Sequence, residues 1–204
     1  MTYFAQQFYN RGYNVLLVDL RGHGQSEGNY IGMGWHDRLD IIDWANYLIA
    51  QNPNCKIILH GVSMGGATVM MATGENLPEN IKVAIEDCGY SSIWDEFKRQ
   101  LIDLYNLPEF PVLNAASSVC KYKAGYKIEE GSAVEQVKKS KTPTLFIHGD
   151  QDSFVPFEML DIVYKSANCE KQKLVVEGAA HAESASVNPD LYWNTIDSFI
   201  RKNI

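Results

Sequence analysis

The sequence predicts an α/β protein built on a doubly wound, mostly parallel sheet with helices on both faces. Short apolar runs typical of buried strands alternate along the chain with longer segments whose apolar residues recur at helical spacing. This alternation is typical of parallel strands joined by crossover helices. Residues 91–140 break the alternation and carry a helical pattern. We therefore expect one domain over residues 1–204, with a small helical insertion at 91–140.

Five short apolar runs predict the strands of this sheet. They are Asn14–Val18, Ile57–Leu59, Val83–Glu86, Thr144–Ile147 and Lys173–Val176. Each is bounded by glycine, proline or polar residues, as expected for strands buried on both faces.

Helical periodicity predicts the segments between these strands. The helices expected around the insertion are Met1–Asn10, Asp37–Ala50, the segment after Ser63, Phe157–Asn168 and Asp190–Arg201. The apolar face of the second is expected to contain Leu39, Ile42, Ala45, Leu48 and Ile49, and that of the last to contain Leu191, Ile196, Phe199 and Ile200. Trp44 and Tyr47 are expected in the core or at its flank.

Composition limits the partners and cofactors. The formal net charge is −7, which argues against nucleic acid or an anionic membrane as the main partner. No apolar run is long enough to cross a membrane, and no signal peptide is visible, so we expect a cytoplasmic protein, with an upstream signal or anchor left open. The four cysteines form no C-x-x-C pair, so we expect reduced thiols and no zinc or redox motif. A homodimer is compatible with the sequence.

One turn carries the strongest chemical signal. Residues 61–65, Gly-Val-Ser-Met-Gly, fit G-x-S-x-G between an expected strand and an expected helix. Glycines 61 and 65 lack a Cβ, which would let strand and helix pass closely while Ser63 projects from a strained turn. An ordinary glycine-rich strand-to-helix turn explains the five residues equally well by themselves, so the assignment depends on residues further along the chain.

An acid and a histidine occur later in the chain, in the order that this chemistry requires. Asp152 comes after the strand at 144–147, and His181 comes after the strand at 173–176. The chain order serine, acid, histidine is that of a nucleophile-elbow hydrolase.

These segments give the chain a resemblance to the α/β-hydrolase superfamily, and within it to bacterial single-domain Bem46-like or peptidase-S9-like hydrolases. The resemblance runs from Ala5 to Phe199 and includes residues 19–26 (DLRGHGQS), the turn at Ser63, residues 149–156 and residues 178–181. It implies a serine hydrolase acting on a small-molecule ester or acyl substrate, without cofactor or metal. It also implies that residues 91–140 form a helical cap, whose apolar side chains either line an acyl pocket or pack the cap in place.

The resemblance assigns a role to each site residue. Ser63 is the expected nucleophile, His181 the general base, and Asp152 the acid that orients and stabilises the imidazolium. The backbone N–H of Met64, directly after the nucleophile, is the expected oxyanion donor.

Other acids and histidines are weaker candidates. Asp150 follows the same strand as Asp152, but the acid is expected directly before the x-x-Val-Pro element, which selects Asp152. Asp87 ends another strand and remains a rival. His23 precedes the nucleophile, so it is a weak candidate for the base, and we expect Asp19 and Arg21 to hold their loop near the site. The remaining histidines are expected at the surface (His36) or as packed, hydrogen-bonded scaffold (His60 and His148).

One expected part does not occur within these 204 residues. In this superfamily a second oxyanion donor comes from a loop after an earlier strand, often marked by His-Gly, and that strand lies between those corresponding to 14–18 and 57–59. We therefore expect the chain to be weakly active or inactive without an N-terminal extension. Two alternatives to an esterase stay open: a peptidase or amidase using the same three side chains, and a non-catalytic module with this fold.

Overall fold

The computed structural model describes all 204 residues, which fall into two compact units, residues 1–31 and 32–204. The first unit begins with helix α1, Thr2–Asn10, which ends as predicted before Gly12 at φ +89°. A loop follows in which Asp19 Oδ2 accepts the backbone N–H of Gln25 at 3.0 Å. Arg21 donates to the Tyr30 hydroxyl at 2.9 Å. These two contacts join parts of the loop to one another.

The predicted strand at Asn14–Val18 is wrong. No hydrogen-bonded ladder includes these residues. Their apolar side chains are exposed, with Val15, Leu16 and Leu17 at 40%, 43% and 49%. An apolar run gives a segment a preference for extended backbone, but only a pairing partner makes it a strand.

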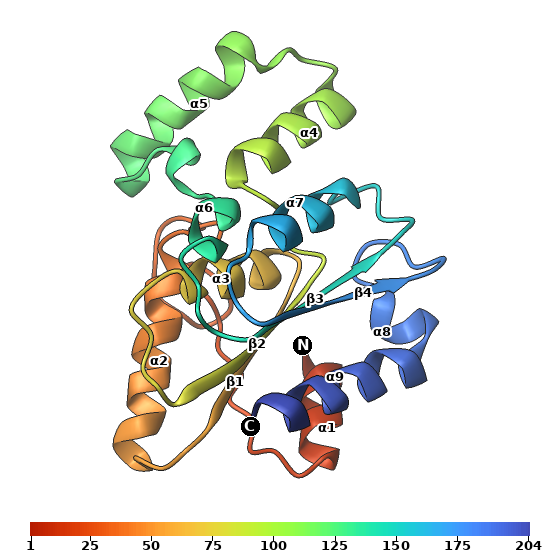
Figure 1. The fold of residues 1–204 in the computed structure, drawn as a ribbon. Helices are drawn as coiled ribbons and strands as arrows, with labels where there is room; N and C mark the ends of the chain where they lie inside the picture. Colours follow the sequence, from red (N-terminus) through yellow and green to blue (C-terminus); the bar gives the residue numbers. More distant parts are fainter. The chain divides into compact units, whose positions relative to one another are not determined.

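The second unit is built on a four-stranded parallel sheet (Figure 1). The strands are β1 (Ile57–Val62), β2 (Ile81–Asp87), β3 (Thr144–Gly149) and β4 (Lys171–Val176), in the spatial order β1-β2-β3-β4. The other four predicted strands are thus confirmed. Because all pairs are parallel, the carboxyl ends lie at one edge of the sheet, where Val62 pairs with Asp87 and Gly149 with Val176.

Helices cover both faces of this sheet, as predicted (Figure 1). One face carries α2 (Asp37–Gln51), α3 (Met64–Thr73), α6 (Ala133–Val137) and α7 (Glu158–Ser166). The other carries α8 (Ser184–Val187) and α9 (Pro189–Asn203). Buried apolar side chains from α3, β3 and α9 fill the core between these layers, among them Met70, Phe146 and Phe199. No helix combines the length and apolar content needed to cross a membrane.

The helix positions were predicted better than their buried faces. In α2, Leu39 is 42% exposed and Trp44 and Tyr47 are also exposed, while Ile41 packs with Ala45 against the core. In α9 the predicted Leu191 is exposed, and its neighbours Tyr192 and Trp193 are buried instead. A small rotation about the helix axis exchanges adjacent residues, and periodicity alone does not fix that rotation.

Residues 91–140 form a helical segment whose first two helices, α4 (Ile93–Tyr105) and α5 (Glu109–Ala124), Figure 1 draws at the top of the view, away from the sheet. The segment also contains the short 3-10 helix η1 (Ile128–Glu130) and α6. The Ser92 side chain caps α4 by accepting the Asp95 N–H at 3.0 Å.

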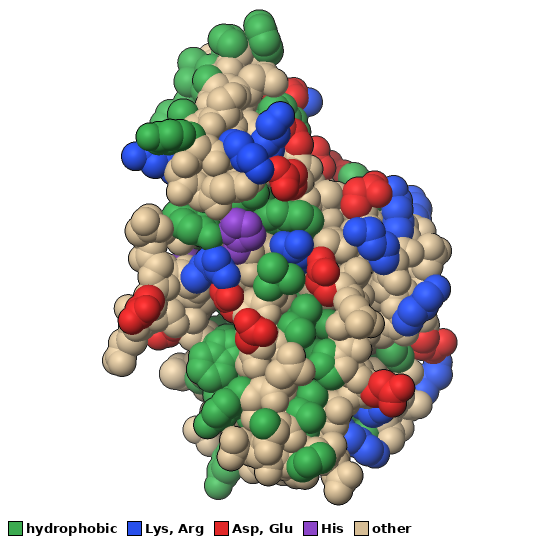
Figure 2. All heavy atoms as spheres, turned by 90° about the vertical axis from the view of Figure 1, so that its left-hand side faces the viewer, with side chains coloured by type: hydrophobic (Ala, Val, Ile, Leu, Met, Phe, Trp, Pro, Cys, Tyr) green, Lys and Arg blue, Asp and Glu red, His purple; other side chains and the backbone are tan.

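The apolar side chains of this segment are divided between the interior and the surface. Leu113 is buried, but Leu104, Tyr105 and Phe110 are 66%, 68% and 75% exposed. Figure 2 shows hydrophobic side chains gathered at this top end of the molecule. These three side chains are therefore too exposed to pack the segment in place.

Candidate active site

Ser63 occupies a sharp turn between strand and helix. β1 ends at Val62 and α3 begins at Met64, and Ser63 between them has φ 57° and ψ −121°. Such a conformation is costly for a residue with a Cβ, and it persists only where neighbours hold it. The Ser63 N–H donates to the Asp87 carbonyl at 2.8 Å, which ties the turn to the end of β2. Met64 is the first helical residue, so its N–H has no acceptor within the helix.

The two glycines of the turn, Gly61 and Gly65, differ in the space available for a side chain. A Cβ on Gly61 would lie 2.1 Å from the Gly65 carbonyl oxygen, so this position excludes any side chain, as predicted. A Cβ on Gly65 would meet nothing within 4 Å. The prediction of close packing at Gly65 is therefore wrong, because the helix leaves that side of Gly65 open.

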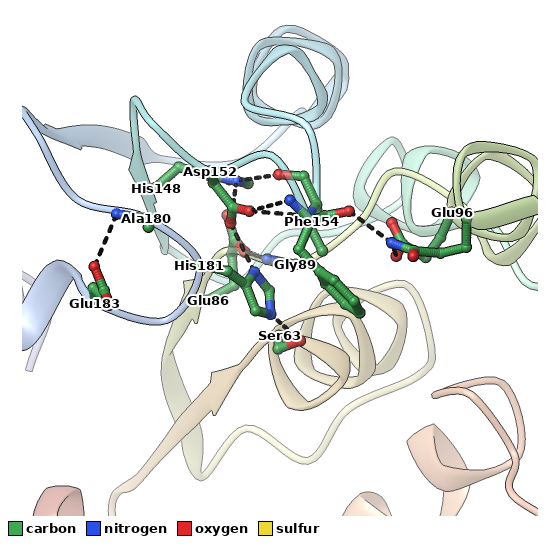
Figure 3. A network of polar contacts seen from close by, with 12 residues as sticks. Ser63, Glu86, Gly89, Glu96, His148, Asp152, Phe154, Ala180, His181 and Glu183 are labelled. Carbon is green, nitrogen blue, oxygen red and sulfur yellow. Dashed lines mark hydrogen bonds and ion pairs between the residues drawn. The ribbon is translucent and has the colours of Figure 1, made fainter. Parts of the chain in front are cut away.

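The structure brings Ser63, His181 and Asp152 into one hydrogen-bonded chain (Figure 3). His181 Nε2 lies 2.8 Å from Ser63 Oγ, and His181 Nδ1 lies 2.8 Å from Asp152 Oδ2. Asp152 can only accept when ionised, so Nδ1 carries a proton, and the other ring nitrogen is left to accept from the serine hydroxyl. The three side chains come from turns that follow β1, β3 and β4, at one edge of the sheet.

Asp152 is held as an ionised acceptor. Its Oδ1 accepts the backbone N–H groups of Phe154 and Val155, both at 3.0 Å. Burial favours the neutral acid, but hydrogen bonds from His148 and His181, the charge of His181 and the Val155 N–H outweigh it. The pKa of Asp152 therefore lies below its usual value.

His148 contacts Asp152 directly, which sequence analysis missed. Its Nε2 lies 3.2 Å from Asp152 Oδ2 and 3.0 Å from the Val155 carbonyl oxygen. Both partners are acceptors, so Nε2 carries a proton. His148 is fully buried and hydrogen-bonded, as predicted for scaffold. The available signal was its position four residues before the acid, at the end of the same strand.

The rival acids are bonded elsewhere. Asp150 Oδ1 accepts the Gly178 N–H at 2.7 Å, which joins the loops after β3 and β4. Asp87 Oδ2 accepts the Tyr192 hydroxyl at 3.0 Å, rather than the backbone amides expected of a loop or cap residue. Burial raises the pKa of Asp87 to about 6. Neither carboxylate bonds to His181.

The other histidines also have their own partners. His60 Nε2 lies 3.2 Å from the Tyr192 hydroxyl, and burial lowers the pKa of His60 to about 4. His23 Nδ1 lies 3.1 Å from the Arg21 carbonyl oxygen, within its own loop. His36, expected at the surface, is half-buried before α2 with its ring 4.9 Å from that of Tyr126.

One group of side chains has atoms spaced closely enough for a metal ion. Ligand atoms of Cys88, Asp152 and His181 lie within 4.8 Å of one another. A metal ligand at Cys88 would have to be a thiolate, and burial raises the pKa of this thiol far above its usual value. The same Asp152 carboxylate already accepts hydrogen bonds from two imidazoles. The donor set is thus better suited to proton transfer than to metal binding.

The strand, turn and helix around Ser63, with the parallel sheet and its two helical layers, define the α/β-hydrolase fold. A family model described as the prolyl oligopeptidase family (Peptidase_S9) matches residues 1–188. The chain belongs to this family.

Individual relatives align in sequence with much of the chain. The YqkD protein of Bacillus subtilis is 29% identical over 198 residues, covering 97% of this chain and 65% of its own length. The bem46 protein of Schizosaccharomyces pombe is 26% identical over 174 residues, covering 83% of this chain and 52% of its own. The chain thus spans less than two thirds of the length of these relatives.

Solved structures give the same fold. The Pyrococcus furiosus esterase Pf2001 has a TM-score of 0.77 at 21% identity, covering 100% of this chain and 76% of that one. The Pyrococcus horikoshii acylaminoacyl peptidase has a TM-score of 0.62 at 18% identity, covering 84% of this chain and 28% of that one.

Proposed function

We propose that this chain carries the catalytic machinery of a serine hydrolase that cleaves carboxylic esters through an acyl-enzyme. The observation that carries the proposal is the relay from Ser63 Oγ through His181 to Asp152, with both contacts at 2.8 Å. Family membership and the esterase with the same fold support it. The proposed cap at 91–140 and a possible homodimer are part of the same hypothesis.

The proposed mechanism follows from the proton positions. His181 Nε2 takes the proton from Ser63 as its oxygen attacks the ester carbonyl, and then delivers that proton to the leaving alcohol. Asp152 keeps Nδ1 protonated and stabilises the imidazolium that forms. The Met64 N–H stabilises the oxyanion, and water then cleaves the acyl-enzyme by the same steps in reverse.

Hydrolysis of p-nitrophenyl butyrate tests the proposal. We expect weak turnover by the wild type, with the Met64 N–H as its oxyanion donor, and turnover at the background level in Ser63→Ala, because the nucleophile is removed. Asp150→Asn is the matched control, since Asp150 shares the loop of Asp152 without touching His181. Turnover by Ser63→Ala equal to that of the wild type would contradict the assignment.

A peptidase or amidase using the same side chains is the second candidate. The family model and the acylaminoacyl peptidase with this fold favour it. Acyl p-nitroanilides matched to the p-nitrophenyl esters separate the two candidates. A kcat/KM for the anilide approaching that for the ester would favour the peptidase.

A further inference from the structure

Glu96 is a buried carboxylate that the proposed mechanism does not use. It lies in the first turn of α4 and is only 4% exposed. Its Oε1 accepts from Gln100 Nε2 at 2.9 Å, but its Oε2 accepts no hydrogen bond from the protein. The nearby Arg99 forms its ion pair with Asp103, so its charge acts on Glu96 only from a distance.

A short series of contacts connects Glu96 to the relay. The Gln100 amide that donates to Glu96 also donates to the Phe154 carbonyl oxygen at 2.9 Å. The Phe154 ring lies 4.8 Å from the His181 ring, centroid to centroid, and is tilted by 44°. Figure 3 shows Phe154 lying between His181 and Glu96. Seen from the reacting serine, the Glu96 carboxylate is therefore on the far side of Phe154.

Burial makes Glu96 expensive to ionise without a partner. Burial raises the pKa of Glu96, and the Asp152 charge adds to the increase. The Gln100 hydrogen bond and the charges of His181 and Arg99 only partly counteract it. A buried carboxylate is stabilised most effectively by a cation that also donates hydrogen bonds. An alkylammonium group supplies both, and it would bring its charge to the unpartnered oxygen.

We propose that Glu96 forms a subsite for a protonated amine carried by the substrate, on the cap side of the reacting serine. This inference rests on the proposed function, because it requires that Ser63 be the reacting group. Glu96 then acts as a specificity-determining residue that binds the substrate and takes no part in proton transfer.

Matched ester pairs test the subsite on both sides of the ester bond. The acyl-side pair is ethyl 6-aminohexanoate and ethyl hexanoate. The alcohol-side pair is 2-(dimethylamino)ethyl butyrate and 3-methylbutyl butyrate, which have similar shapes but differ in charge. For each pair, kcat/KM is measured with the wild type, with Glu96→Gln and with Asp103→Asn. The last variant removes an exposed negative charge from the same helix.

In at least one pair we expect the wild type to favour the amine ester by about tenfold or more, as for a charge-assisted hydrogen bond. Glu96→Gln should lose that preference while hydrolysing the neutral ester at a rate within about twofold of the wild type. Asp103→Asn should keep the preference.

Other outcomes overturn the inference. Equal amine-to-neutral ratios in the wild type and Glu96→Gln would contradict the amine subsite, and so would an equal loss on all four esters. Covalent labelling of Ser63 by a fluorophosphonate without hydrolysis of any of these esters would contradict the subsite alone. If Ser63 is neither labelled nor able to turn over an ester, the proposed function fails and the subsite fails with it.

Discussion

Nε2 of His148 lies 3.2 Å from Oδ2 of Asp152, the same carboxylate oxygen that lies 2.8 Å from Nδ1 of His181. Both imidazoles donate to that oxygen, and two backbone N–H groups donate to the other. The carboxylate is thus fixed from four directions, and its orientation in turn fixes the His181 ring. His148 is therefore a positioning residue that acts through Asp152.

Replacing His148 should lower turnover without changing substrate binding. His148→Leu removes the hydrogen bond to Asp152, worth about 1–2 kcal/mol, so kcat should fall by about tenfold with KM unchanged. His148→Gln keeps an N–H donor near the position of Nε2 and should retain most of the activity. Steady-state kinetics on p-nitrophenyl butyrate measure both variants. Equal losses in the two variants would show that His148 only fills space.

The two buried acids should respond very differently to the same substitution. Asp152→Asn leaves the geometry intact but favours the wrong tautomer of His181, so kcat should fall by about 10³- to 10⁴-fold. Asp87→Asn should change kcat by no more than about threefold, because Asp87 bonds to Tyr192 and not to His181. The reverse order of effects would identify Asp87 as the working acid.

Stability should separate the two glycines of the turn. Gly61→Ala puts a methyl group 2.1 Å from the Gly65 carbonyl oxygen, so strand and helix must move apart. We expect a loss of about 3 kcal/mol or more in the free energy of unfolding. Gly65→Ala meets open space in a helix and should change it by less than about 1 kcal/mol, in the stabilising direction. Denaturant unfolding of both variants measures the difference, and similar losses would contradict the packing described.

Asp87 should make stability depend on pH. Its pKa is about 6 in the folded state against an ordinary value of 3.8, so the folded state holds the proton more tightly than the unfolded state. The contribution of Asp87 to stability is therefore fully present below pH 3.8 and is lost as pH rises through about 6.

Asp87→Asn replaces the carboxyl with an amide that does not ionise, so comparing it with the wild type isolates the pH-dependent contribution of Asp87 to stability. The stability of the variant relative to the wild type should improve by roughly 3 kcal/mol between acid and neutral pH, about two pKa units at 1.36 kcal/mol each. Urea unfolding of both proteins across this range measures the difference. A difference in stability that does not vary with pH would contradict the buried, hydrogen-bonded environment of Asp87.

The sequence predicted the reacting groups because each follows a strand in a parallel sheet. Parallel strands bring their carboxyl ends to one edge, so Ser63, Asp152 and His181 were placed together by chain order alone. Contacts between side chains that are distant in the chain leave no comparable signal in the sequence. Glu96 was passed over within an aromatic-rich helix, although its spacing from Ile93 and Gln100 places it on the buried side of α4.

The local sequence pattern also does not determine which strands pair or how a helix is rotated about its axis. The apolar run at Asn14–Val18 has strand composition, but whether it forms a ladder depends on a partner strand. Leu191 and Tyr192 are adjacent on α9, and the choice between them is made by Asp87 and His60, both of which contact the Tyr192 hydroxyl. Such a choice depends on residues more than a hundred positions away.

Covalent labelling with a fluorophosphonate tests the central claim most directly. The reagent phosphonylates a serine whose hydroxyl is activated by a neighbouring base, and it requires no knowledge of the natural substrate. Intact-mass and peptide analysis should show one adduct per chain, on Ser63, and labelling should be lost in Ser63→Ala and strongly slowed in His181→Ala. Absence of an adduct on the wild-type chain, or an adduct on a different residue, would contradict the account.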